Sequence, residues 1–265
     1  MEGSESTINL AEATLLIAKE EFADLDVSMY LGLLDELARL AASHLEGMRE
    51  PAEQVDALSR FLFVDQGFRG NREDYYDPAN SYLNCVLERR TGIPITLAVV
   101  YTEIGQRLGL PLFGVGFPGH FLVKYVGVVD EILVDPFFGA RLSAEQCEER
   151  LQAMYGRGAR LDPSLLRPAT AKEMLVRILR NLKNAYQQRE DWPRTLACLD
   201  RVLLMLPDSA LELRDRGLTY YRLECFGAAL ADLECYLTLA REGDEGMASV
   251  RELLPSLRHA VQRLN

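Results

Sequence analysis

The sequence predicts an α+β protein in which a buried helix leads into a small antiparallel sheet, with helical segments before and after this core. Three observations support the prediction. Apolar residues recur with helical spacing before residue 68, short strand-like runs begin at Leu112, and an internal repeat of 34 residues follows Thr170. We therefore expect a helical N-terminal region over residues 1–68, the core over residues 69–165, and helical repeats over residues 166–265.

The N-terminal region has the pattern of three amphipathic helices. Thr7 or Asn9 is expected to cap the first helix, and Ser28 the second, which runs to about Leu45. Pro51 suits the first turn of the third helix, where the missing N–H group of proline is not needed. These helices form the part of the chain that precedes the core.

The negative charge of the chain is concentrated in this region. Residues 1–67 hold 4 Lys or Arg against 14 Asp or Glu, so they carry most of the chain's net charge of −11. Phosphate binding depends on Lys and Arg, so this composition argues against a nucleic-acid partner. The simpler interpretation of the charge is a solvated acidic helical face, and a docking surface for a basic partner is the alternative.

A short helix is expected near the start of the core. Asn80 or Ser81 is placed to cap it, and it covers Tyr82–Arg89. Cys85 lies on this helix, one step away from its apolar stripe.

The central part of the core opens with a turn that ends at Pro94, followed by a helix over about Ile95–Leu108. This helix is apolar nearly all round, which is typical of a helix buried inside a fold. Gly109 and Pro111 end it. Three strand-like runs come next, separated by glycine and proline: Leu112–Phe117, His120–Val126 and Glu131–Asp135.

A further helix follows the strands. Ser143 and Gln146 have the spacing of a capping box, which predicts a helix that runs to about Tyr155. The segment Arg157–Pro168 is punctuated by glycine and proline and is the expected linker to the repeats.

The 34-residue repeat predicts two pairs of helices. A shift of 34 residues superposes Tyr186 on Tyr220, and Leu199 on Leu233. This period resembles tetratricopeptide helix pairs, an architecture in which each repeat packs on its neighbours. The expected pairs are Thr170–Gln188 with Trp192–Leu206 and Ser209–Leu223 with Gly227–Ala240, followed by a capping helix over Met247–Leu264.

Several classes of protein are disfavoured by what the sequence lacks. No apolar run reaches the ~18 residues that would cross a bilayer, and the N-terminus has no export signal, so we expect a cytoplasmic protein without a membrane partner. The cysteines have no CxxC spacing, which disfavours a disulfide framework or a zinc site. We expect neither a metal nor a cofactor. The cysteines are Cys85, Cys147, Cys198, Cys225 and Cys235.

Two residues in the core have the chemistry of a catalytic pair. His120 begins one strand-like run and Asp135 ends the next, so antiparallel pairing would bring them within hydrogen-bond reach. A histidine oriented by an aspartate is the base half of a catalytic triad. The alternative is a structural pair in which a buried histidine and an Asp-Pro turn satisfy each other.

The motifs around this pair resemble a known superfamily. A helix that passes through R-x-x-G-[IL]-P into strands ending in G-H-x and [VI]-D-P is similar to the transglutaminase-like, papain-type core. More narrowly, three stretches followed by tetratricopeptide helices resemble the bacterial SirB family; they read DPANSYLNCVLERRTGIPITLAVVY, GLPLFGVGFPGHFLVKY and LVDPFFG. The resemblance covers nearly the whole chain. It implies a cysteine at the helix start, and it matches His120 and Asp135 to the family's histidine and aspartate.

The nucleophile is where this sequence departs from the pattern. The superfamily places its cysteine fifteen residues ahead of the glycine of a Gly-[Ile/Leu]-Pro turn, and counting back from Gly109 leads to Pro94. Proline has no nucleophilic side chain. The nearest substitutes are Thr96, two residues further on, and Cys85, on the preceding helix.

The resemblance therefore implies two functions of different class. The first is a pseudoenzyme, a non-catalytic interaction or regulatory protein that binds a protein or a peptide. The second is a cysteine- or threonine-dependent amide hydrolase or transglutaminase-like enzyme that uses Cys85 or Thr96 with His120 and Asp135. An active enzyme would place the sulfur or oxygen near the imidazole, whereas a binding protein would show a His–Asp pair without a nucleophile.

Overall fold

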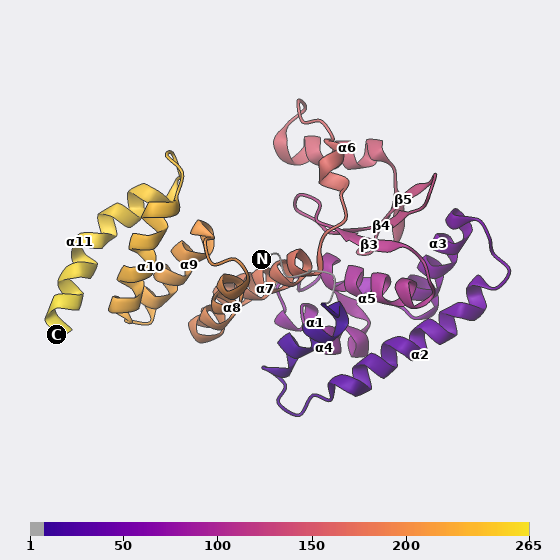
Figure 1. The fold of residues 1–265 in the computed structure, drawn as a ribbon, viewed down its shortest axis with the longest axis horizontal. Coiled ribbons are helices and arrows are strands. Elements are labelled where there is room, and N and C mark those ends of the chain that lie inside the picture. The colour runs from indigo at the N-terminus through magenta and orange to yellow at the C-terminus, as the bar shows by residue number, and fades with distance from the viewer. Residues whose placement is uncertain (1–7, 265) are drawn as a thin grey trace. The chain divides into compact units, whose positions relative to one another are not determined.

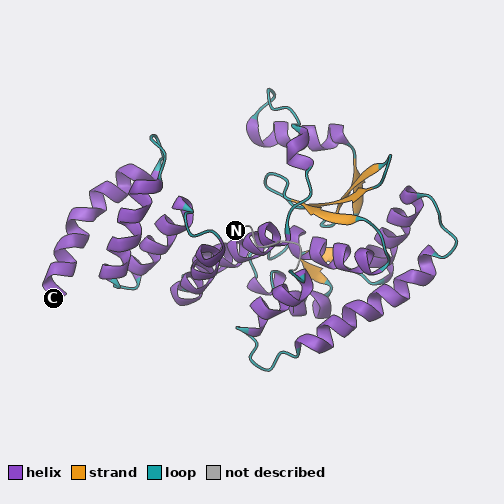
Figure 2. Cartoon of the chain, viewed as in Figure 1, coloured by secondary structure: helices purple, strands orange, loops and turns teal. Residues whose placement is uncertain are grey.

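The computed structural model describes residues 8–264 and has the mixed α and β architecture that the sequence predicts (Figures 1 and 2). The chain divides into two compact units, residues 1–178 and residues 179–265. Each unit is described by itself below. The division into three parts at residues 68 and 165 stays a prediction.

The first unit opens with three helices, α1 (Leu10–Lys19), α2 (Val27–Leu45) and α3 (Pro51–Arg60), as predicted. Asn9 caps α1 by accepting a hydrogen bond from the Glu12 amide at 3.1 Å, whereas Thr7 lies outside the described residues. A π-helical turn, Phe61–Asp65, extends α3.

The prediction that Ser28 caps α2 is wrong. The cap is Asp26, whose Oδ1 accepts from the amides of Ser28 at 2.9 Å and Met29 at 3.3 Å. Ser28 instead donates its hydroxyl to the same carboxylate oxygen at 2.6 Å. A carboxylate at the N-cap also interacts favourably with the helix dipole, which accounts for the preference.

The caps predicted for the next helix are wrong as well. Helix α4 covers Leu83–Arg89, and its N-cap residue is Tyr82, which makes no side-chain cap bond. Asn80 belongs to a preceding 3₁₀ turn, Pro78–Asn80, and its buried side chain hydrogen-bonds a neighbouring loop. A polar residue in this position is therefore used for tertiary contacts rather than for the helix end.

The core helix α5 (Pro94–Arg107) is buried over its whole first three turns, as its uniformly apolar sequence predicts. It packs against a four-stranded antiparallel sheet of order β3-β4-β5-β6. The strands are β3 (Leu112–Val115), β4 (Leu122–Val126), β5 (Glu131–Asp135) and β6 (Ala140–Leu142). Two further short strands, β1 (Arg69–Gly70) and β2 (Thr91–Gly92), pair in parallel next to the start of α5.

Two of the strand predictions need correction. Strand β4 begins at Leu122, so His120 lies in the turn before the strand, and β3 ends at Val115 rather than at Phe117. Gly119 has a φ angle of +65°, and the His120 amide donates to the Phe117 carbonyl at 3.0 Å, which makes this segment a tight turn. Strands β1, β2 and β6 were not predicted because each has only two or three residues.

Helix α6 (Ala144–Tyr155) covers the other face of the four-stranded sheet, so the sheet lies between α5 and α6 (Figure 1). Its predicted capping box is confirmed, since Ser143 and Gln146 exchange side-chain and backbone hydrogen bonds. Cys147 and Leu151 of α6 are buried against Val115 and Leu122 of the sheet. This packing fixes the position of α6 above the ends of β4 and β5.

Helix pairs make up the second unit, as the 34-residue repeat predicts. Helix α7 (Ala171–Gln188) leads into α8 (Trp192–Met205), α9 (Ala210–Arg222), α10 (Phe226–Leu239) and α11 (Gly246–Leu264). Leu233 and Tyr236 of α10 are completely buried in the core of this unit, and Leu257 of α11 is buried in the same core. None of the helices within residues 8–264 is long and apolar enough to cross a membrane.

Candidate functional site

His120 and Asp135 are in direct contact, as predicted. His120 Nε2 lies 2.9 Å from Asp135 Oδ1. Strands β4 and β5 are antiparallel, with Val123 opposite Val134, so the residues just before β4 and at the end of β5 meet at one edge of the sheet. The Asp135 side chain is completely buried, and 15% of the His120 side chain remains exposed. The pair therefore faces solvent only through the imidazole.

The Asp135 carboxylate is held by three further groups. Its Oδ1 accepts hydrogen bonds from the amides of Phe137 at 3.0 Å and Phe138 at 3.3 Å, and its Oδ2 lies 2.7 Å from Arg150 Nη1. Burial by itself would raise the pKa of Asp135, but the His120 hydrogen bond, the charge of His120 and the Arg150 guanidinium outweigh it, so the pKa is lowered. Asp135 is therefore an ionised anchor at neutral pH.

The sequence did not indicate Arg150. It lies on α6, fifteen residues beyond Asp135, and only the packing of α6 on the sheet brings its side chain to the carboxylate. Its contact follows from tertiary structure and leaves no local sequence signal.

Aromatic rings surround the imidazole. The ring centroids of Phe137 and Phe138 lie 6.1 Å and 6.2 Å from that of His120. Phe138 is half exposed, with the Arg72 guanidinium 4.7 Å and the Arg150 guanidinium 5.6 Å from its ring centroid. Both distances are typical of cation–π contacts. These rings restrict access to His120.

Pro94 is the first residue of α5 and is buried. The resemblance predicts a cysteine at this position, and the equivalence stays a prediction. A thiolate at a helix N-terminus would gain from the helix dipole, but the pyrrolidine ring offers only a fixed φ angle.

Thr96 is also buried, and its hydroxyl is fully used. Its Oγ1 donates to the carbonyl of Asn80 at 2.7 Å and accepts from the Ile93 amide at 3.2 Å. The hydroxyl proton is thus directed at a carbonyl and not at an imidazole. Thr96 ties the start of α5 to the loop that ends at Asn80.

Cys85 is half buried on α4. Burial raises the pKa of its thiol to about 11, with a further contribution from the Glu88 carboxylate. The charged groups that act on it belong to its own helix and the preceding loop, namely Glu88, Arg89 and Asp77. At neutral pH it is a protonated thiol, which is a poor nucleophile.

Among the described cysteines, Cys147 is the one whose surroundings include Asp135 and Arg150, and sequence reasoning did not single it out. It is completely buried in the core between α6 and the sheet, and burial raises the pKa of its thiol. Cys147 is therefore part of the apolar core.

The chain matches the models of two known families. The family model of the transglutaminase-like superfamily matches residues 28–180, more than half of the chain. The chain belongs to this superfamily. The tetratricopeptide repeat model matches residues 182–255.

Individual relatives place the chain more narrowly. It is 45% identical over 240 residues to a UPF0162 protein of Xylella fastidiosa, covering 89% of this chain and 85% of the relative. It is 34% identical over 206 residues to a UPF0162 protein of Vibrio cholerae, covering 76% of each. F-box only protein 21 of Pongo abelii is 30% identical over 207 residues, which is 74% of this chain and 32% of that protein.

A pocket of about 710 Å³ lies next to the pair of His120 and Asp135. Its walls include Phe137 and Phe138, the rings that surround His120, together with Arg69, Arg72 and Arg89. We call it the arginine–phenylalanine pocket. Pockets of this size commonly hold small molecules or side-chain groups.

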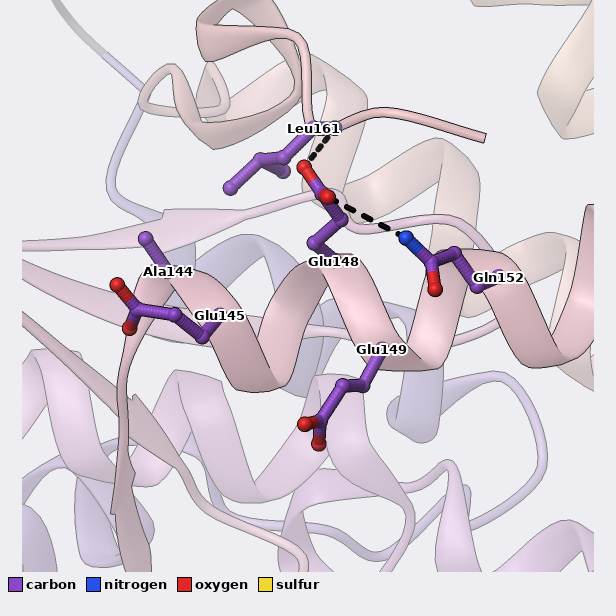
Figure 3. Close-up of a pocket in the computed structure, with 6 residues that line it drawn as sticks. All are labelled: Ala144, Glu145, Glu148, Glu149, Gln152 and Leu161. Carbon is purple, nitrogen blue, oxygen red and sulfur yellow. Dashed lines mark hydrogen bonds between the residues drawn. The ribbon is translucent and has the colours of Figure 1, made fainter. Parts of the chain in front are cut away.

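A second hollow lies along α6 and is acidic (Figure 3). Glu145, Glu148 and Glu149 line it, with Gln152 and Leu161. Glu148 accepts hydrogen bonds from the Leu161 amide at 3.1 Å and from Gln152 at 3.2 Å, so its carboxylate holds the following loop in place. Within residues 8–264, no group of three or more His, Cys, Asp or Glu side chains is arranged to hold a metal ion.

Proposed function

We propose that this chain is a pseudoenzyme, a non-catalytic interaction protein that binds a protein or a peptide. The main support for this proposal is Pro94, which starts α5 at the position where the superfamily resemblance calls for the nucleophile. The tetratricopeptide repeats support a binding role, because stacked helical repeats present extended surfaces to partners. A regulatory role, as the narrower SirB resemblance implies, and a cytoplasmic location belong to the same proposal.

In this proposal the His–Asp pair is structural. Asp135 is occupied by His120, Arg150 and two backbone amides, so its carboxylate fixes the turn that carries Phe137 and Phe138. His120 completes this arrangement. A catalytic dyad needs a nucleophile within hydrogen-bond reach of its imidazole, and neither candidate offers a free one.

The alternative, an amide hydrolase or a transglutaminase-like enzyme, receives no support from the two candidate nucleophiles. The Thr96 hydroxyl donates to the carbonyl of Asn80, and the pKa of Cys85 is raised to about 11 by burial. In this alternative His120 is the base, so it would have to lie next to Thr96 or Cys85. The hydrogen-bond partner of the imidazole is instead Asp135, and the Thr96 hydroxyl donates to a backbone carbonyl.

A substrate screen tests the proposal. The full chain is incubated with a broad set of peptide, ester and amide substrates, and with an amine acceptor for transamidation, before and after alkylation with iodoacetamide. We expect no turnover above that of the His120→Ala variant. Turnover that alkylation and Cys85→Ala both abolish would refute the proposal and identify Cys85 as the nucleophile, whereas turnover lost in Thr96→Val alone would identify the threonine.

A further inference from the structure

The arginine–phenylalanine pocket carries positive charge in a chain whose net charge is −11. Arg69 and Arg72 are both exposed, and neither has an ion-pair partner among residues 8–264. Arg89 also lines the pocket and is paired with Asp77 at 2.9 Å. Among the described lining residues, Glu73 supplies the one carboxylate. The pocket thus has two guanidinium groups available to an anion.

Aromatic side chains also line the pocket. Phe68 is almost fully buried and Phe138 is half exposed. Phe137 lies directly on the backbone of Gly70, where an added Cβ would overlap its ring. Gly139 has a φ angle of +67°, and an added Cβ would lie 3.0 Å from the Phe63 ring, so glycine avoids strain in the turn between β5 and β6. The pocket therefore offers an apolar face beside the two cations.

The loop that carries the arginines is already ordered. Asn71 Oδ1 accepts from the amides of Glu73 at 3.2 Å and Asp74 at 3.0 Å, and its Nδ2 donates to Asn80 Oδ1 at 3.1 Å. Asn80 is completely buried and receives the Thr96 hydroxyl on its carbonyl. A binding loop that is fixed before binding loses less conformational entropy on association.

We propose that this pocket binds an acidic peptide segment of a protein partner. Carboxylates of the peptide pair with Arg69 and Arg72, whose planar guanidinium groups match a carboxylate with two parallel hydrogen bonds. An apolar or aromatic side chain of the peptide packs on the part of the half-exposed Phe138 ring that the Arg72 and Arg150 guanidinium groups leave uncovered. The proposal rests on the binding function proposed above and names the class of partner.

The charge distribution favours a short acidic peptide over a nucleic acid. A nucleic acid is a long polyanion, and residues 1–67 of the same unit hold 14 acidic against 4 basic residues. Such a field repels an extended polyanion, whereas a short acidic segment needs only the local positive surface.

A selection experiment tests the proposal. A phage-displayed library of random peptides is selected in parallel on the full chain, on Arg69→Gln/Arg72→Gln and on Arg49→Gln/Arg157→Gln. The last variant is a matched control, because it removes the same charge at two exposed positions that do not line the pocket. We expect peptides rich in Asp and Glu with an aromatic residue, enriched on the full chain and on the control but not on the pocket variant.

An enriched peptide is then synthesised with a fluorescein label, and its affinity is measured by fluorescence anisotropy. We expect the pocket variant to bind it about tenfold or more weakly, as for lost hydrogen bonds to charged groups, and the control variant to bind within about twofold. Glu73→Gln should tighten binding because it removes the carboxylate of the lining. Added salt should weaken it. Circular dichroism confirms that each variant is folded.

Three results would overturn the pocket proposal. Each can be told apart from a failure of the proposed non-catalytic function. Selected peptides without acidic enrichment, or equal binding to the pocket variant, would reject the pocket and retain a peptide-binding protein. A labelled twelve-residue oligothymidylate that binds with the same arginine dependence, while no peptide is enriched, would assign the pocket to nucleic acid. Amide turnover in the substrate screen would instead reject the non-catalytic function.

Discussion

Replacing Asp135 with asparagine tests whether this carboxylate is a structural anchor. Asparagine keeps the shape of the side chain and an oxygen that accepts from the amides of Phe137 and Phe138, but it places an NH₂ group against Arg150, whose Nη1 lies 2.7 Å from Oδ2. The change removes one member of a charge pair whose carboxylate is completely buried. Such losses cost about 3–5 kcal/mol when the remaining charge stays buried.

The expected cost of Asp135→Asn lies below this range. The Arg150 side chain is 32% exposed, so its charge regains water when the carboxylate is lost. We therefore expect Asp135→Asn to lower the free energy of unfolding by about 2–3 kcal/mol. Urea unfolding followed by far-UV circular dichroism measures this loss. Trp192 is the one tryptophan of the chain and lies in the second unit, so its fluorescence would not report directly on the site.

The pH dependence gives an independent test of the same carboxylate. Because the pKa of folded Asp135 is lowered, its contribution to stability is present above the unfolded value of about 3.9 and is lost as the pH falls through the lowered folded value. The stability difference between the original protein and Asp135→Asn should thus be largest near neutral pH and shrink below about pH 4.

A double-mutant cycle with Arg150→Gln provides the control. The coupling between the two sites should be about 1–3 kcal/mol at neutral pH, because the two side chains are in contact. A loss below about 0.5 kcal/mol for Asp135→Asn, or a cycle without coupling, would refute the anchoring role of the carboxylate.

Three further predictions concern other parts of the chain. Cys85, whose pKa is raised to about 11, should react with iodoacetamide more slowly at pH 7.5 than an exposed cysteine, and its rate should rise with pH. Peptide mass spectrometry measures the labelling rate, and fast labelling of Cys85 would contradict its buried setting. Thr96→Val removes the hydrogen bond to Asn80 and should cost about 1–3 kcal/mol in urea unfolding, and an unchanged midpoint would contradict the bond. Gly217→Ala places a methyl group 2.7 Å from a leucine of α10 and should lower the thermal midpoint, whereas Gly227→Ala, with no atom within 4 Å, should not; equal midpoints would contradict the close packing.

The sequence predicts the elements whose signals are local. Helix α5 follows from its continuous apolar composition and from Pro94 and Gly109 at its ends, and the helix pairs follow from the 34-residue period. The contact between His120 and Asp135 is predictable because antiparallel neighbours bring the start of one strand next to the end of the other.

The remaining features depend on tertiary packing. Arg150 reaches Asp135 only because Cys147 and Leu151 seat α6 on the sheet. The cap of α2 was misplaced because Asp26 and Ser28 both have side chains that can cap a helix, and the carboxylate of Asp26 takes the role. The cap of α4 was misplaced because that helix begins after Tyr82 without a side-chain cap bond. The arginine–phenylalanine pocket is lined by segments that precede and follow α5 in the sequence. Periodicity within one segment cannot predict that two distant segments come together.

The several partners of Asp135 have a consequence for how related sequences evolve. One buried side chain binds the imidazole, two backbone amides and a guanidinium, so losing it would damage the fold even if the protein performed no chemistry. In a lineage that had lost its nucleophile, selection on folding alone would therefore retain both Asp135 and His120. A His–Asp pair in such a lineage is then evidence of the shared fold and not of catalysis. Only a thiol or hydroxyl within reach of the imidazole would indicate a catalytic site.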